Sequence, residues 1–175
     1  MISTYTTKEL DIIRKYRTPE AVQKFIKSLE YNLEKDEESI RSFRRVVRDR
    51  KAHCLEGAIT AATILGNHGF GTNILDLVIK GDVDHVVYIY GNNGKYGSIG
   101  QSREKCLLGK PAKFNSVEEL VKEYHKKALT KTKGLYSFAI ADLDEIYGAN
   151  WRFGKRNLWV IERYLHSIKH KLVKS

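Results

Sequence analysis

The sequence has few cysteines, few prolines and no long apolar run. Only Cys54 and Cys106 occur among 175 residues, too few for a disulfide framework, which favours a reducing cytoplasm. Two prolines and 42% hydrophobic residues exclude a low-complexity disordered chain. Because no stretch of about 18 apolar residues occurs, we expect no membrane span. The start of the sequence, residues 1–7, also lacks the basic and apolar segments of a signal peptide.

Basic residues outnumber acidic ones, 31 to 21, which gives a formal net charge of +10. Such an excess raises the question of nucleic acid or another anionic partner. Many of the basic residues lie at 41–51, directly after an acidic stretch at 30–38. In a helix, Glu37 and Arg41 would lie one turn apart. We therefore interpret the charge mainly as a solvated surface with weak ion pairs, and keep an anionic partner as the alternative.

The length predicts one domain over residues 1–175. Its expected parts are an N-terminal helical part (1–50), a catalytic-type core (51–105) and the remaining helices and strand (106–175). A chain this long buries about 70% of the surface that it exposes when unfolded. We therefore expect a core that needs neither disulfides nor metal ions.

Capping signals predict two helices near the N-terminus. Thr6 and Glu9 form a capping box, and Thr18-Pro19 starts a second helix that carries apolar residues at 3-1-3 spacing as far as Leu29. Residues 52–65 are apolar nearly all round, which is typical of a buried helix. Two further helices are predicted: one after Ser116 as far as Leu129, and a basic amphipathic one at 158–173.

Runs of β-forming residues predict strands at 73–79, 84–91, 95–100 and 135–141. The turn Asn93-Gly94 indicates that the second and third strands pair as an antiparallel hairpin. Helices thus come first and last, with a small antiparallel sheet between them. This order predicts an α+β fold in which the buried helix packs on one face of the sheet.

Cys54 is predicted to stand at the start of the buried helix, after the charged residues 48–51. Helix-start N–H groups and nearby cations stabilise a thiolate, which is the nucleophilic form of cysteine. His85 opens the second strand, and alternation places it on the same face as Val87 and Ile89. If that face meets the helix, the histidine approaches the cysteine, as in thiol enzymes that transfer acyl groups.

This part of the sequence resembles the transglutaminase-like superfamily, whose members share a papain-like architecture. The resemblance covers roughly residues 40–105 and is carried by three segments: Ala52-His53-Cys54-Leu55-Glu56-Gly57-Ala58, Asp84-His85-Val86-Val87-Tyr88-Ile89-Tyr90 and Lys95-Tyr96-Gly97-Ser98-Ile99-Gly100. It implies a thiol-dependent hydrolase or acyltransferase that acts on an amide or acyl substrate. Cys54 would be the nucleophile and His85 the general base. The superfamily also contains inactive relatives, so the resemblance implies the fold more firmly than the reaction.

The third catalytic residue of that family, an aspartate on the next strand, has no match in this sequence. The corresponding place lies near 98–100, and Asp84 is expected to point to the opposite face from His85. A neutral acceptor, Ser98 or Gln101, is therefore the candidate that orients the imidazole. Such an acceptor stabilises an imidazolium less than a carboxylate does, so we expect a weaker or narrower activity.

Three alternatives accompany this interpretation. Cys54 is also compatible with a small space-filling residue, and Cys106 is expected to be one. His53 next to the cysteine suggests a metal site with His85, but no further ligands complete the set, so we expect neither a metal nor a cofactor. The alternative function is a catalytically inactive domain that acts as a basic binding module for nucleic acid or protein.

Overall fold

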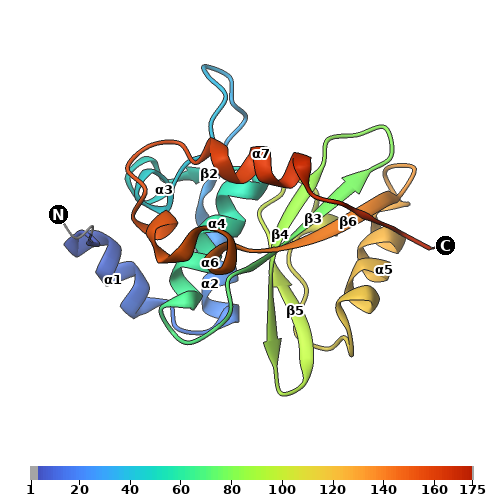
Figure 1. Ribbon diagram of the computed structural model, residues 1–175, viewed down its shortest axis with the longest axis horizontal. Coiled ribbons are helices and arrows are strands. Elements are labelled where there is room, and N and C mark those ends of the chain that lie inside the picture. Colours follow the sequence, from blue (N-terminus) through green and yellow to red (C-terminus); the bar gives the residue numbers. More distant parts are fainter. Residues whose placement is uncertain (1–3, 175) are drawn as a thin grey trace.

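The computed structural model describes residues 4–174 and has the predicted α+β organisation. Figure 1 shows most of the helices gathered at one end and a twisted sheet, with α5 beside it, at the other. The α-helices are α1 (Thr7–Lys15), α2 (Pro19–Ser28), α3 (Phe43–Asp49), α4 (Cys54–Gly66), α5 (Val117–Ala128), α6 (Leu143–Tyr147) and α7 (Trp159–Ser167). Two 3-10 helices are η1 (Lys105–Leu107) and η2 (Gly148–Phe153).

The main sheet is antiparallel throughout. Its strand order is β5-β4-β3-β6-β7, made of β3 (Asn73–Ile79), β4 (His85–Asn92), β5 (Lys95–Ile99), β6 (Leu135–Asp142) and β7 (Lys171–Leu172). The predicted hairpin joins β4 and β5 through Asn93 and Gly94, both at positive φ. A short parallel pair, β1 (Glu30–Tyr31) with β2 (Lys51–Ala52), leads the chain into α4.

Local capping explains where the first helices begin. Thr6 accepts from the backbone of Glu9, whose carboxylate accepts from the backbone of Thr6, and Thr18 caps α2 with Pro19 in its first turn. Both predicted helix starts are confirmed. Ser116 likewise caps α5.

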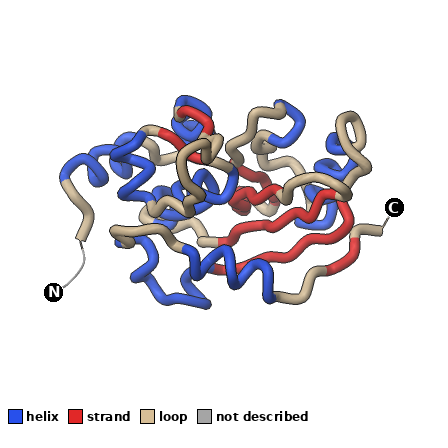
Figure 2. The backbone as a smooth tube through the Cα atoms, turned by 90° about the horizontal axis from the view of Figure 1, so that it is seen from above, coloured by secondary structure: helices blue, strands red, loops and turns tan. Residues whose placement is uncertain are grey.

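Figure 2 shows helices on either side of the sheet. A cluster of buried apolar side chains lies on each side. The larger cluster joins α2, α3 and α4 to the β4 side chains Val86, Tyr88 and Tyr90. The smaller one packs Val87 and Ile89 of β4 against α5. As predicted, α4 is buried along almost its whole length, and its glycine and alanines allow close packing.

The predicted C-terminal helix is shorter than expected. The apolar spacing predicts a helix over 158–173, but α7 ends at Ser167 and the chain then extends into β7. The apolar spacing continues past this point, but residues 171–172 pair with the edge of β6 instead. His170 is held there because its Nε2 lies 2.8 Å from Oδ2 of the buried Asp76. Within residues 4–174, no helix combines the length and apolar character needed to cross a membrane.

Candidate active site

Cys54 is the first residue of α4, as predicted from the start of the apolar pattern. Its half-buried thiol lines a cavity of about 390 Å³. The sulfur lies 4.0 Å from the backbone oxygen of Asp84, directly before β4. The cavity has both polar and apolar walls and carries both signs of charge; its polar lining residues include Tyr31, His53, Asp76, Asp84, Arg103 and His166. The thiol at the N-terminus of α4 is therefore accessible to a substrate in this cavity.

His85 lies beside Cys54, and a hydrogen bond on the far side of its ring fixes the orientation of the imidazole. The side chain is only 4% exposed, and Nε2 lies 2.7 Å from the carbonyl oxygen of Leu107. Because a carbonyl only accepts hydrogen bonds, Nε2 carries the hydrogen and Nδ1 is the nitrogen available to the thiol. The acceptor behind the imidazole is thus a neutral backbone group.

His53 is a second imidazole at the same sulfur. Its Nε2 lies 2.8 Å from the carbonyl oxygen of Ser39, which leaves Nδ1 for Cys54 in the same way. Adjacent residues within a helix would point apart. His53, however, precedes the helix in an extended conformation, with φ −90° and ψ −173°, so helical geometry does not separate the two side chains. The role of His53 was missed for this reason.

The two imidazoles control ionisation at the site. Burial raises the pKa of the Cys54 thiol, but hydrogen bonds and positive charge from His53 and His85 outweigh burial and lower this pKa from 9.0 to about 6. Burial lowers the pKa of His53, but interactions with Cys54 and Glu56 outweigh burial and raise this pKa from 6.5 to about 9. At neutral pH the arrangement therefore favours a thiolate beside an imidazolium.

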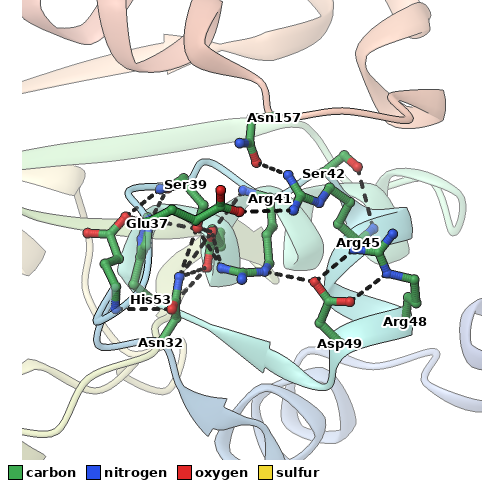
Figure 3. Close-up of polar contacts among 12 residues, drawn as sticks. Asn32, Glu37, Ser39, Arg41, Ser42, Arg45, Arg48, Asp49, His53 and Asn157 are labelled. Atoms are coloured by element: carbon green, nitrogen blue, oxygen red, sulfur yellow. Dashed lines mark hydrogen bonds and ion pairs between the residues drawn. The ribbon is translucent and has the colours of Figure 1, made fainter.

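Glu56 is the buried carboxylate at the centre of a hydrogen-bond network beside His53. Figure 3 shows Ser39, Arg41 and His53 gathered in this network. The fully buried Glu56 carboxylate accepts hydrogen bonds from the hydroxyl of Ser39 at 2.7 Å and from the backbone of Arg41 at 2.8 Å and His53 at 2.9 Å. Asn32 also donates to it. Burial raises the pKa of Glu56, but the positive His53 ring and these donors outweigh burial and lower it. The loop at 32–41 is thereby fastened to the start of α4.

The face of β4 that carries His85 does not pack against α4; the opposite face does. Val87 and Ile89 share the face of His85, and this face packs against α5, whereas α4 packs against the face of Val86 and Tyr88. His85 nevertheless reaches the thiol because it is the first residue of β4, at the end of the sheet where α4 begins. Position along the strand, rather than the face, brings the two groups together.

Neither Ser98 nor Gln101 contacts the His85 ring through a hydrogen bond among residues 4–174. Ser98 bonds to the phenol of Tyr124 at 2.8 Å and accepts from the backbone of Lys110 at 3.0 Å. Gln101 donates its amide to carbonyl oxygens at the end of α2 and accepts from the backbone of Ser102. The acceptor expected of these side chains is supplied by Leu107 instead. A backbone carbonyl leaves no residue-type signal in a sequence.

The basic stretch after residue 40 is largely engaged in ion pairs. Arg41 pairs with Asp49 and Glu56 rather than with Glu37, because the chain before α3 is not helical. Glu37 pairs instead with Arg45 at 3.6 Å. The predicted i,i+4 pair is therefore wrong, although the charges do neutralise one another. Among residues 4–174, no group of three or more His, Cys, Asp or Glu side chains is arranged to hold a metal ion.

Part of the chain is similar to a known protein family. The sequence model of the Vasohibin family matches residues 70–141, less than half of the chain. This span holds β3 to β6, and with them His85 and Leu107, but it does not reach Cys54. The match supports a transglutaminase-like, cysteine-dependent type of domain. No curated protein matches the chain.

Proposed function

We propose that this protein is a thiol-dependent hydrolase or acyltransferase that cleaves an amide or acyl bond with Cys54 as nucleophile and His85 as proton carrier. The proposal rests on one observation: the Cys54 sulfur lines an open cavity and interacts with the imidazoles of both His53 and His85. Each ring is fixed at Nε2 by a backbone carbonyl, from Leu107 and Ser39 respectively. A space-filling cysteine would need none of these partners.

In the first half of the reaction, the Cys54 thiolate attacks the substrate carbonyl carbon and forms a carbon–sulfur bond. The carbonyl oxygen takes up the electron pair, and the backbone N–H of Cys54 is positioned to donate to it, because first-turn N–H groups lack an intrahelical acceptor. His85 then gives its Nδ1 proton to the leaving nitrogen or oxygen. The proton that His85 gives is the one that Nδ1 received from the Cys54 thiol when the thiolate formed. The bond to the leaving group breaks, and a thioester remains on Cys54.

In the second half, His85 accepts a proton from water or from an amine as that nucleophile attacks the thioester. The carbon–sulfur bond breaks, the acyl group leaves with its new partner, and the thiolate is regenerated. Leu107 keeps the imidazole in the required tautomer throughout. Because this acceptor is neutral, it stabilises the imidazolium less than a carboxylate would.

The proposal is tested with iodoacetamide in a Cys106→Ser background, which leaves Cys54 as the only thiol. Alkylation followed by mass spectrometry across pH 5 to 10 should show a midpoint near 6, as the lowered thiol pKa requires. His85→Ala should move the midpoint upwards. A midpoint near the ordinary value of 9.0, or one that does not respond to His85→Ala, would contradict the proposal.

Turnover is then sought with a mixture of defined peptides and amides, and the products are identified by mass spectrometry. The Cys54→Ala variant is the matched control. Product formation that persists in this variant would show that another group does the chemistry.

A further inference from the structure

The Leu107 carbonyl that holds His85 belongs to the connection between β5 and α5, residues 100–116, in which the 3-10 helix η1 is the only helix or strand. A carboxylate side chain can rotate toward an imidazole, whereas a backbone carbonyl points wherever its segment is held. Correct orientation of His85 therefore requires other groups to fix residues 105–110.

Lys110 supplies the first of these groups. Its Nζ donates to the carbonyl oxygens of Cys106 and Leu108, both at 2.8 Å. These carbonyls flank the one that faces His85. The ammonium is half-buried and lies 4.7 Å from the centre of the Tyr124 ring. One side chain thus fixes the peptide groups on both sides of the Leu107 carbonyl.

Tyr124 and Ser98 form the second support. The Tyr124 hydroxyl donates to the Leu108 carbonyl at 3.1 Å, so its single hydrogen is used there. The Ser98 hydroxyl must then donate to Tyr124 across 2.8 Å, while it accepts from the Lys110 backbone at 3.0 Å. The hydrogen bonds run in one direction from Lys110 through Ser98 and Tyr124 to Leu108. Tyr124 is completely buried and comes from α5.

The same segment is pressed against β5. Ser98 also donates its backbone N–H to the Lys110 carbonyl at 2.8 Å. A Cβ atom at Gly109 would collide with the Ser98 carbonyl oxygen and with the Gln23 side chain. The segment therefore lies closer to the strand than any residue other than glycine permits.

We propose that Lys110, Tyr124 and Ser98 are positioning residues that set the Leu107 carbonyl against Nε2 of His85 and thereby maintain the reactive state of Cys54. The inference rests on the proposed function of the Cys54–His85 pair. In this proposal Ser98 acts on His85 indirectly, because it holds the segment 105–110 that carries the Leu107 carbonyl. The half-buried position of Lys110 agrees with this role. Burial lowers the pKa of Lys110 because it disfavours the charged ammonium, and the two carbonyl partners stabilise that charge.

The first test measures the alkylation midpoint of Cys54 in the Cys106→Ser background. Lys110→Met and Tyr124→Phe should each raise the midpoint by about one pH unit, because a poorly held His85 stabilises the thiolate less. Lys110→Arg keeps a cation and its donors and should restore most of the shift. Lys105→Met, which removes an exposed lysine from the same turn, is the matched control and should leave the midpoint unchanged.

The second test does not depend on the thiol. In a Cys54→Ala background, long-range nitrogen–proton NMR reports the tautomer of neutral His85. The parent should show hydrogen on Nε2, and Lys110→Met should show a mixture of tautomers. Circular dichroism identifies a variant that fails to fold, in which case Ser98→Ala and Tyr124→Phe carry the test.

The outcomes separate the two proposals. An ordinary thiol midpoint in the parent overturns the proposed function, whatever the tautomer shows. A low midpoint that depends on His85 but not on Lys110, Tyr124 or Ser98, together with an unchanged tautomer in the folded variants, overturns the positioning role alone.

Discussion

His53 and His85 meet at one sulfur although they come from opposite sides of the site, one from the residue before a helix and the other from the start of a strand. The nitrogen of each ring that faces away from the thiol contacts a backbone carbonyl, at 2.8 Å for His53 and 2.7 Å for His85. This arrangement differs from the single imidazole oriented by Ser98 or Gln101 that the sequence analysis expects.

Replacing His53 with glutamine should raise the pH midpoint of Cys54 alkylation by about 1 to 3 pH units, because the thiolate loses an adjacent positive charge. The measurement is iodoacetamide labelling in the Cys106→Ser background. His166→Gln, which alters another imidazole on the wall of the same cavity, is the control and should change the midpoint little. An unchanged midpoint in His53→Gln would show that His85 alone maintains the thiolate.

The alkylation rate should depend on pH in two steps. As the pH rises through about 6, the Cys54 thiol loses its proton and the rate increases. As it rises further through about 9, His53 loses its proton, the thiolate is released from one partner, and the rate changes again. Stopped-flow or quenched labelling measures both steps. Only the upper step should vanish in His53→Gln; its survival there would assign it to another group.

Glu56→Gln should lower the free energy of unfolding by about 3–5 kcal/mol, since it leaves Arg41 without its fully buried carboxylate partner. Urea denaturation followed by circular dichroism measures the loss. The control is Glu37→Gln, because Glu37 is 66% exposed and its pair with Arg45 should contribute at most about 1 kcal/mol. Equal losses in the two variants would rule out Glu56 as the hub of this network.

Gly109→Ala should destabilise the protein by about 1–3 kcal/mol, because the added methyl group meets the backbone of β5. Gly91→Ala is a matched glycine substitution with no atom within 4 Å of the new methyl group and no positive φ to strain. Comparing the two by urea denaturation removes the general effect of replacing a glycine. A stable Gly109→Ala variant would mean that the segment can move away from β5.

His170→Ala should loosen the C-terminal part of the chain. The His170–Asp76 contact is the polar attachment that joins the end of α7 to β3, and β7 adds two pairings with β6. Hydrogen exchange should therefore speed up at residues 168–173 while β3 and β4 remain protected. Uniform acceleration across the sheet would instead indicate global destabilisation.

Features set by local chemistry were predicted best. The capping box at Thr6, the start at Thr18-Pro19 and the hairpin turn at Asn93-Gly94 depend on neighbours in sequence, and each is confirmed. The helix that begins at Cys54 follows from its apolar composition. In these places a few adjacent residues suffice to determine the backbone.

Features set by distant partners were not predictable in the same way. Apolar spacing continues through Leu172, but pairing with β6 ends the helix earlier. The conformation of His53 depends on Ser39 and Glu56, which reach it across a loop. Leu107 acts through its carbonyl, a group that every residue has. Residue type therefore located the thiol and one imidazole but not the supports behind them.

The reactive centre is divided between two parts of the chain: Cys54 and His53 lie at the start of α4, whereas His85 lies in the sheet and Leu107 in the connection that follows β5. Until α4 docks on the sheet, the sulfur lacks His85, and the Cys54 thiol is less ionised and reacts more slowly than in the assembled site. The rate of Cys54 alkylation therefore reports whether α4 has docked on the sheet, and it can be followed during refolding. A fragment limited to residues 70–141 would carry the base without a nucleophile.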